Sequence, residues 1–255
     1  MRALLRACHP TPTVAVTLLA VGLASAWGRG PGGVLLVAAT VLSGQLSIGW
    51  CDDAADAAKD RGRTDKPIAA GAIPASTVRQ AARVALLVSV LLSVANGWPG
   101  VLHLLVVASG WAYAMWLERT VASPLPYLVA FGALPAYVHL GTLGRPEWWV
   151  VVVGALLGLG AHFANVLPDI ERDRRAGVRG LPQRLGATVT RWIAPLPPAV
   201  GTAVLVFAVD LPAPLAVGAG AVALLAIAMP RWERLTFLAV LAVATVDLLV
   251  LAFVG

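Results

Sequence analysis

The sequence predicts an all-α membrane protein with about nine transmembrane helices. Of its 255 residues, 59% are hydrophobic and only 13% are charged, and the mean hydropathy is +0.82. A soluble domain of this size does not need so much apolar surface, whereas a helical membrane protein does. Nine apolar runs have about the length that crosses a bilayer, at roughly 11–28, 32–51, 78–97, 100–117, 124–142, 147–167, 188–208, 213–229 and 235–254.

The basic residues predict the orientation of these helices. With the N-terminus in the cytoplasm, sixteen of the nineteen Lys and Arg residues lie in or beside cytoplasmic segments, Arg83 lies inside the third run near its cytoplasmic end, and only Arg29 and Arg145 lie on the other side. The positive-inside rule then places the N-terminus and both polar loops described below in the cytoplasm of a multi-pass cell-membrane protein. This asymmetry explains the net charge of +6, so we expect a lipid bilayer as partner and no nucleic acid.

The first run needs separate attention. Arg2 and Arg6, the apolar stretch and the triplet at 24–26 also form the pattern of a secretory signal peptide. We expect the run to be retained as a helix, because its loss would break the repeat described below. His9 is interpreted as an interfacial residue. Two cysteines, Cys8 and Cys51, are too few for a disulfide framework and are expected to be free thiols.

The stretch Asp52–Pro74 concentrates charge in a chain that is otherwise mostly hydrocarbon. If the preceding helix continues into it, Asp52, Asp56 and Asp60 share one face, with Asp53 beside them. Carboxylates so close repel one another and must be neutralised. A hard divalent cation with oxygen ligands is a natural partner, and Mg²⁺ is typically held by carboxylates together with a substrate's phosphates.

Basic residues follow these carboxylates directly, and Arg and Lys are suited to binding phosphate groups. They are Arg61, Arg63 and Lys66. The alternative interpretation of the stretch is a solvated loop of mixed charge between membrane helices.

A second stretch, Asn165–Gly186, repeats the arrangement. Asn165, Asp169 and Asp173 again stand at four-residue steps and are followed by arginines, including Arg179. Adding 113 to the first set gives the second: Asp52, Asp56, Asp60, Arg61 and Lys66 become Asn165, Asp169, Asp173, Arg174 and Arg179. Eight of the thirteen acidic residues lie in these two stretches. We therefore expect one domain, 1–255, with repeat halves of roughly 1–120 and 121–230.

Other polar and aromatic residues lie near the cytoplasmic ends. Tyr113, Glu118 and Arg119 end the fourth helix there, and His162 precedes the second stretch as either a base or a packed side chain. Several aromatic residues are either interfacial or line a pocket that stabilises a carbocation. They are Trp111, Trp116, Tyr127, Phe131 and Tyr137.

These residues resemble the UbiA superfamily of intramembrane prenyltransferases. That family carries two aspartate-rich motifs, N-D-x-x-D-x-x-x-D and D/N-x-x-x-D-x-x-x-D, each followed by a basic loop. The first corresponds to Asp52-Asp53-x-x-Asp56-x-x-x-Asp60, and the second to Asn165-x-x-x-Asp169-x-x-x-Asp173. The resemblance covers essentially the whole chain and implies a bundle built from two four-helix repeats and one further helix.

The resemblance also implies site residues for Mg²⁺-dependent prenyl transfer from an isoprenoid diphosphate. The implied metal ligands, catalytic except for Asn165, are Asp53, Asp56, Asp60, Asn165, Asp169 and Asp173. The implied substrate-binding residues are Asp52, Arg63, Lys66, Tyr113, Arg119, Asn165 and Arg179. Three positions depart from the family: Asp52 replaces a usual Asn, Tyr113 is followed by Glu118-Arg119 instead of Lys-Arg, and Gly180 replaces a frequent Thr.

The acceptor is left open by these residues. An aromatic small molecule is expected first, and a terpene cyclase without a separate acceptor is the alternative. A membrane transporter would also carry repeats and intramembrane carboxylates. The carboxylates here, however, cluster at one membrane face, which argues against transport.

Overall fold

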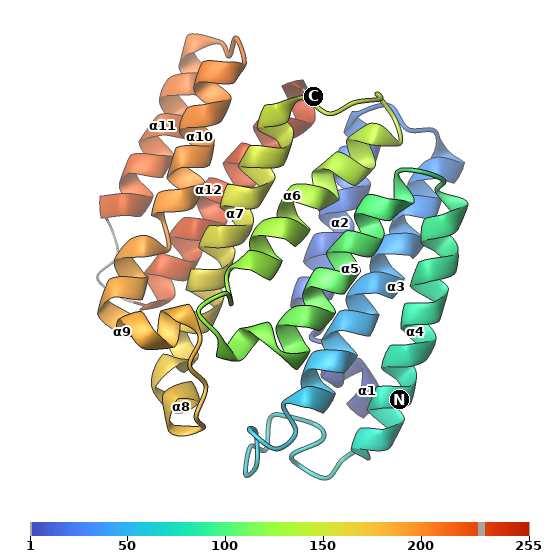
Figure 1. Ribbon diagram of the computed structural model, residues 1–255. Coiled ribbons are helices and arrows are strands. Elements are labelled where there is room, and N and C mark those ends of the chain that lie inside the picture. The colour runs from blue at the N-terminus through green and yellow to red at the C-terminus, as the bar shows by residue number, and fades with distance from the viewer. Residues whose placement is uncertain (1, 229–232, 255) are drawn as a thin grey trace. The chain divides into compact units, whose positions relative to one another are not determined.

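The computed structural model describes residues 2–228 and 233–254, and these residues form an all-α protein (Figure 1). Arg231, one of the sixteen basic residues that predict the orientation, lies outside the described residues. The α-helices are α1 Arg2–Ala7, α2 Pro10–Ala26, α3 Pro31–Ala55, α4 Ala75–Ala95, α5 Gly100–Met115, α6 Leu125–Leu140, α7 Trp148–Val166, α8 Ile170–Arg175, α9 Leu181–Ile193, α10 Leu196–Ala208, α11 Ala213–Ala228 and α12 Glu233–Val254. Two 3-10 turns are η1 Leu117–Arg119 and η2 Leu167–Asp169.

Each predicted apolar run coincides with one of these helices or with a pair of them. In the described part of the chain, α3, α4 and the stretch Trp148–Arg175 are long and apolar enough to cross a membrane, and α9 with α10 makes a fourth if the bent pair is one span. Helices α2, α5, α6, α11 and the Leu238–Ala252 part of α12 are apolar but shorter. The all-α prediction is confirmed, and the count of nine spans stays a prediction.

The seventh run differs from the expected continuous helix. Helices α9 and α10 are bent by 41° at a short break, and Gly186 inside α9 has a φ of 81°. Pro195, Pro197 and Pro198 lie at this break. Proline has no backbone N–H to continue the helical ladder, and its ring clashes with the preceding turn, so the chain changes direction there.

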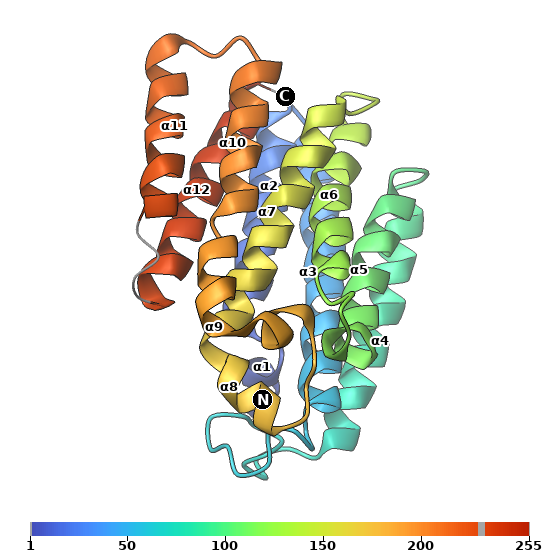
Figure 2. The same ribbon diagram turned by 60° about the vertical axis from the view of Figure 1, so that its left-hand side comes forward.

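The chain divides into two compact units. The first comprises Met1–Trp116 and Tyr137–Gly144, and α2, α4 and α5 all pack against α3 within it (Figure 1). The second comprises Leu117–Ala136 and Arg145–Gly255. In that unit α10 packs against α7, α11 and α12, and α10 and α11 run antiparallel (Figure 2). The prediction of one domain with two repeat halves stays a prediction.

Both cysteines are free, as expected, and both are buried. Cys8 lies between α1 and α2, and burial raises the pKa of its thiol. A higher pKa leaves less thiolate at neutral pH, so Cys8 is a poor nucleophile in the folded protein.

Close helix packing in the second unit depends on glycine. A Cβ placed on Gly158 of α7 would overlap the Tyr127 carbonyl oxygen and the Phe131 side chain of α6. Small residues of this kind let helix backbones approach in membrane proteins.

We expect Gly158→Ala to destabilise the protein by about 1–3 kcal/mol, because the added methyl group has no space against backbone. The melting temperature in detergent measures this effect. Gly218→Ala on α11 is the matched control, since a Cβ there meets nothing within 4 Å, and it should cost nothing. Equal melting temperatures for the two variants would contradict the packing described here.

Candidate active site

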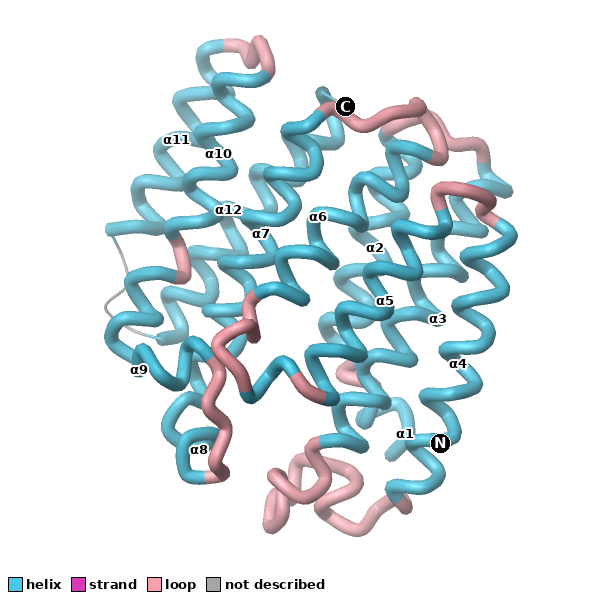
Figure 3. Tube along the Cα trace, viewed as in Figure 1, coloured by secondary structure: helices cyan, strands magenta, loops and turns pink. Residues whose placement is uncertain are grey.

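The first aspartate-rich motif begins inside α3, which continues past Trp50 to Ala55 as the sequence predicts. The turn then carries on: the Asp56 amide donates to the Asp52 carbonyl, and the Asp60 amide donates to the Asp56 carbonyl, both at 2.9 Å. Asp52, Asp56 and Asp60 therefore follow one another at single helical turns. The rest of the connection to α4 is irregular loop (Figure 3).

Three carboxylates of this motif are buried, with Asp53 and Asp60 3% exposed and Asp56 6% exposed. Buried charges require partners, because removing them from water is costly. The chain supplies two of these partners one turn further on. Lys59 Nζ lies 2.7 Å from Asp56 Oδ2, and an Arg63 guanidinium nitrogen lies 3.4 Å from Asp60 Oδ1.

Lys66 lies against the same cluster from the loop. Its Nζ is 3.6 Å from Asp53 Oδ1 and 3.8 Å from Asp60 Oδ2. Arg63 also binds Asp65, and this hydrogen bond lowers the pKa of Asp65 to about 2. The predicted phosphate-binding residues Arg63 and Lys66 thus neutralise the predicted metal-binding carboxylates.

The second motif is divided between three elements. Asn165 lies in the last turn of α7, Asp169 ends η2, and Asp173 lies in α8. Pro168 explains the interruption, because it removes a backbone donor where α7 would otherwise continue. Asp169 is partly exposed and pairs with Arg172 at 2.7 Å, whereas Asp173 is buried.

Asp173 has a partner that the sequence analysis missed. Gln183 is 3% exposed, and its side-chain amide donates to Asp173 Oδ2 at 3.1 Å. Gly180 makes room for this contact, since a Cβ there would meet Gln183 Oε1 and the Glu118 carbonyl oxygen. The departure from the frequent Thr at position 180 therefore has a steric reason. No local pattern marks Gln183 as buried.

Aromatic and hydroxyl groups surround the start of this motif. The Asn165 amide donates to the Tyr127 hydroxyl at 3.3 Å, and the Tyr127 ring stacks on Phe131 with centroids 6.2 Å apart. His162 is 1% exposed and lies 3.2 Å from Ser123 Oγ. His162 is therefore a packed side chain.

The remaining predicted residues lie at the surface or near it. Tyr113 is half-buried in α5, while Arg119 in η1 and Arg179 before α9 are exposed. Asp52 is partly exposed beside the buried carboxylates. The structure gathers six predicted residues within the first unit: Asp52, Asp53, Asp56, Asp60, Arg63 and Lys66.

The first cluster offers carboxylate oxygen atoms, which are the ligands that a hard cation binds. Asp53 Oδ2 is buried and has no hydrogen-bond partner among the described residues, so an acceptor oxygen is available. Carboxylate oxygens are what Mg²⁺ prefers. Among the described residues, no group of three or more His, Cys, Asp or Glu side chains is arranged to hold a metal ion. In the first cluster, Lys59, Arg63 and Lys66 pair with the carboxylates instead.

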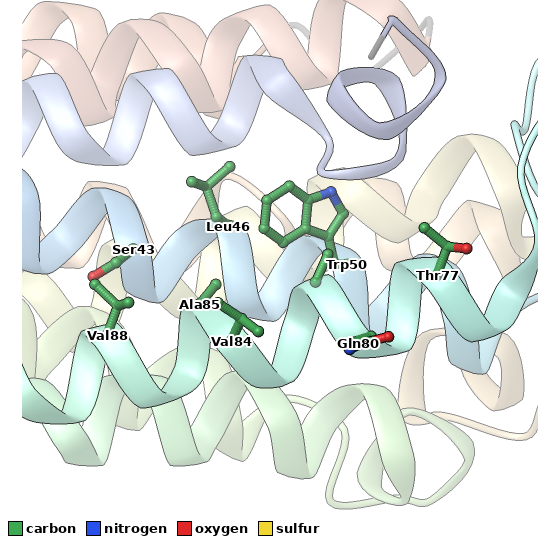
Figure 4. A pocket seen from close by; sticks show the side chains of 9 residues that line it. Ser43, Leu46, Trp50, Thr77, Gln80, Val84, Ala85 and Val88 are labelled. Atoms are coloured by element: carbon green, nitrogen blue, oxygen red, sulfur yellow. The ribbon is translucent and has the colours of Figure 1, made fainter.

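A groove of about 470 Å³ lies elsewhere on the first unit, between α3 and α4 (Figure 4). Its lining is mostly apolar and includes Leu46, Trp50 and Val84. None of its lining residues is a predicted site residue. The groove is therefore separate from the carboxylate cluster.

The fold and the two clusters define a helical membrane protein with paired aspartate-rich segments. Comparison of the chain with known protein families gives its family. The model of the UbiA prenyltransferase family matches residues 12–239. The chain therefore belongs to the UbiA prenyltransferase family and is a multi-pass membrane protein.

Two curated relatives are bacteriochlorophyll synthase 33 kDa chains. The protein of Cereibacter sphaeroides is 35% identical over 181 residues, and that of Rhodobacter capsulatus is 33% identical over 180 residues. Each match covers 63% of this chain and only 58% of the relative's length.

Solved structures share the fold at low identity. A UbiA homolog from Archaeoglobus fulgidus bound to GPP and Mg²⁺ has a TM-score of 0.78 and 14% identity, covering 98% of this chain and 97% of that one. A UbiA homolog from Aeropyrum pernix K1 has a TM-score of 0.73 and 20% identity, covering 92% and 94%.

The contact between Gln183 and Asp173 gives a test of the second cluster. Gln183→Leu removes a donor from a buried carboxylate, so we expect a loss of about 1–3 kcal/mol in stability. Thermal unfolding in detergent measures it. Gln80→Leu on α4, where the glutamine is exposed, should change stability by less than about 0.5 kcal/mol. Unfolding of Gln183→Leu at the wild-type temperature would show that the contact contributes nothing.

Proposed function

We propose that this chain transfers a prenyl group from an isoprenoid diphosphate to a small acceptor within the membrane, in a reaction that depends on Mg²⁺. The observation that supports this most is the buried first cluster, in which carboxylates suited to Mg²⁺ pair with Lys and Arg side chains suited to phosphate. A family member solved with GPP and Mg²⁺ supports the choice of substrate class.

The carboxylates and the cations have different proposed roles. Bound Mg²⁺ would neutralise charge that develops on the leaving diphosphate. The residues proposed to hold it are Asp53, Asp56, Asp60, Asn165, Asp169 and Asp173. The residues proposed to contact the diphosphate are Asp52, Arg63, Lys66, Tyr113, Arg119, Asn165 and Arg179. The aspartates hold the Mg²⁺, and Arg63 and Lys66 orient the phosphates. The apolar helices keep water from the prenyl chain.

The proposed acceptor differs from the aromatic one that the sequence favours. Both curated relatives are named as bacteriochlorophyll synthase chains, so they favour a non-aromatic acceptor of that class.

The orientation proposed from the basic residues places both motif segments in the cytoplasm, where soluble diphosphates and Mg²⁺ are available.

A terpene cyclase is the second candidate. One observation favours it: the stacked rings of Tyr127 and Phe131 lie beside Asn165, at the start of the second motif. Aromatic faces attract cations, so this pair is placed to stabilise a carbocation. In a cyclase the double bonds of the substrate itself would capture that cation.

The test is turnover of geranyl, farnesyl and geranylgeranyl diphosphates by the purified protein in detergent, with and without Mg²⁺ and with and without acceptor. We expect diphosphate release that requires Mg²⁺ and an acceptor. Asp56→Ala and Asp169→Ala should each lower the rate at least about a hundredfold, because each removes a proposed ligand of the charge-stabilising ion. Asp210→Ala, which removes an exposed aspartate outside both motifs, should keep the wild-type rate.

The outcomes separate the candidates. Release of a cyclic product without acceptor would make the protein a cyclase. Transfer to an aromatic acid, but not to a bacteriochlorophyll precursor, would restore the expectation from the sequence. No binding or turnover under any of these conditions would rule out the proposed enzyme.

A further inference from the structure

The N-terminal residues reach the first carboxylate cluster through an unusual bend. Residues 2–9, the N-terminal hook, comprise α1, Cys8 and His9. His9 has φ 53° and ψ 68°, and among the described residues it is the only one other than glycine with a positive φ. L-amino acids with a side chain rarely adopt this left-handed conformation. Such a residue persists where surrounding contacts fix it, which is typical of functional sites.

Contacts along the hook fix it against α3 and the motif loop. Trp50 Nε1 donates to the Leu4 carbonyl at 2.8 Å, and an Arg6 guanidinium nitrogen donates to the Asp65 carbonyl at 3.0 Å. A Cβ placed on Gly49 would overlap the Cys8 carbonyl, so α3 leaves space for the bend. The hook is therefore bound to the chain both before and after the aspartates of the first motif, at Trp50 and at Asp65.

The bend brings the His9 imidazole to two charged site residues. Its Nε2 is 3.3 Å from Asp52 Oδ2 and 3.3 Å from Lys66 Nζ. With a hydrogen on Nε2 the ring donates to Asp52, and with the hydrogen on Nδ1 the same nitrogen accepts from Lys66. One side chain thus contacts both the first carboxylate of the motif and the lysine that neutralises Asp53 and Asp60.

We propose that His9 is a positioning residue of the first carboxylate cluster for an isoprenoid diphosphate: with a hydrogen on Nε2 it holds the Asp52 carboxylate, and with the hydrogen on Nδ1 it holds the Lys66 ammonium. This inference rests on the proposed function. It gives a physical reason for the departure at position 52. An asparagine carries its own amide donor, whereas an aspartate carboxylate only accepts, so aspartate needs a donor from elsewhere. His9 supplies that donor.

A glycine substitution separates this role from a merely structural one. Glycine adopts positive φ without steric cost, so His9→Gly keeps the bend and removes only the imidazole. Its melting temperature should equal or exceed that of the wild type. Its affinity for geranyl thiolodiphosphate, a substrate analogue that reacts poorly, should fall about tenfold in the presence of Mg²⁺, as measured by calorimetry. His9→Gln, which retains a donor and an acceptor, should recover part of the affinity.

Thr13→Ala is the matched control for the hook. The Thr13 hydroxyl donates to the Cys8 carbonyl at 2.8 Å, so the substitution removes a contact of the hook backbone and no charged side chain. We expect a lower melting temperature with unchanged affinity for the analogue. If His9 acts through Asp52, Asp52→Asn makes it less necessary, and the double variant His9→Gly/Asp52→Asn should lose less affinity than the two single losses combined.

The results distinguish this inference from the proposed function. A folded wild type that binds no analogue would overturn both. A wild type that binds, together with a His9→Gly variant of equal affinity, would overturn only the role of His9. If the loss of affinity correlates with the decrease in melting temperature across His9→Gly, His9→Gln and Thr13→Ala, the hook has only a structural role.

Discussion

The need to neutralise buried carboxylates governs the arrangement of the two aspartate-rich motifs. A carboxylate that leaves water needs a hydrogen-bond donor or a cation as partner, and a basic side chain one helical turn away is a local source of one. The pairs Asp56–Lys59, Asp60–Arg63 and Asp169–Arg172 all have the i,i+3 spacing. The basic residues that follow the aspartates in sequence therefore stabilise the folded motifs in the absence of ligand. Any bound cation must replace some of these contacts.

The two motifs share a spacing but differ in structure. In the first, α3 runs on smoothly and its turn continues through Asp60, whereas Pro168 breaks the second into a 3-10 turn and a short helix. As a result Asp56 is buried while its counterpart Asp169 is partly exposed. Asp60 and Asp173 are both buried, but they have different partners. Arg63 and Lys66 contact Asp60, whereas Gln183 contacts Asp173. The sequence repeat thus keeps the spacing of the polar residues and not their surroundings.

Local features of this protein could be predicted from sequence, and contacts between distant residues could not. The continuation of α3 past Trp50 follows from helical spacing, and the apolar runs follow from composition, because both depend on neighbouring residues. The sequence did not predict the bend between α9 and α10, although it contains prolines there. Proline interrupts a helix, but it does not determine whether the chain ends the helix or continues it in a new direction. The contact between Lys66 and His9 joins residues 57 positions apart, and it depends on a backbone conformation that histidine does not favour. No propensity or period encodes such a contact.

Lys66 and Arg63 are held differently in the first cluster, and the difference suits the proposed binding of a ligand there. Arg63 is held by two carboxylates, Asp60 and Asp65, and its planar guanidinium is fixed by that geometry. Lys66 has a flexible stem, and its contacts with Asp53 and Asp60, at 3.6 and 3.8 Å, are longer than a close ion pair. In the proposed reaction its ammonium would turn toward the diphosphate, and Asp53 and Asp60 would then hold a cation in its place, so that their charge stays compensated. In this proposal His9 would hold Lys66 before the exchange and Asp52 after it, which requires an acceptor form and a donor form, and imidazole provides both at a single nitrogen.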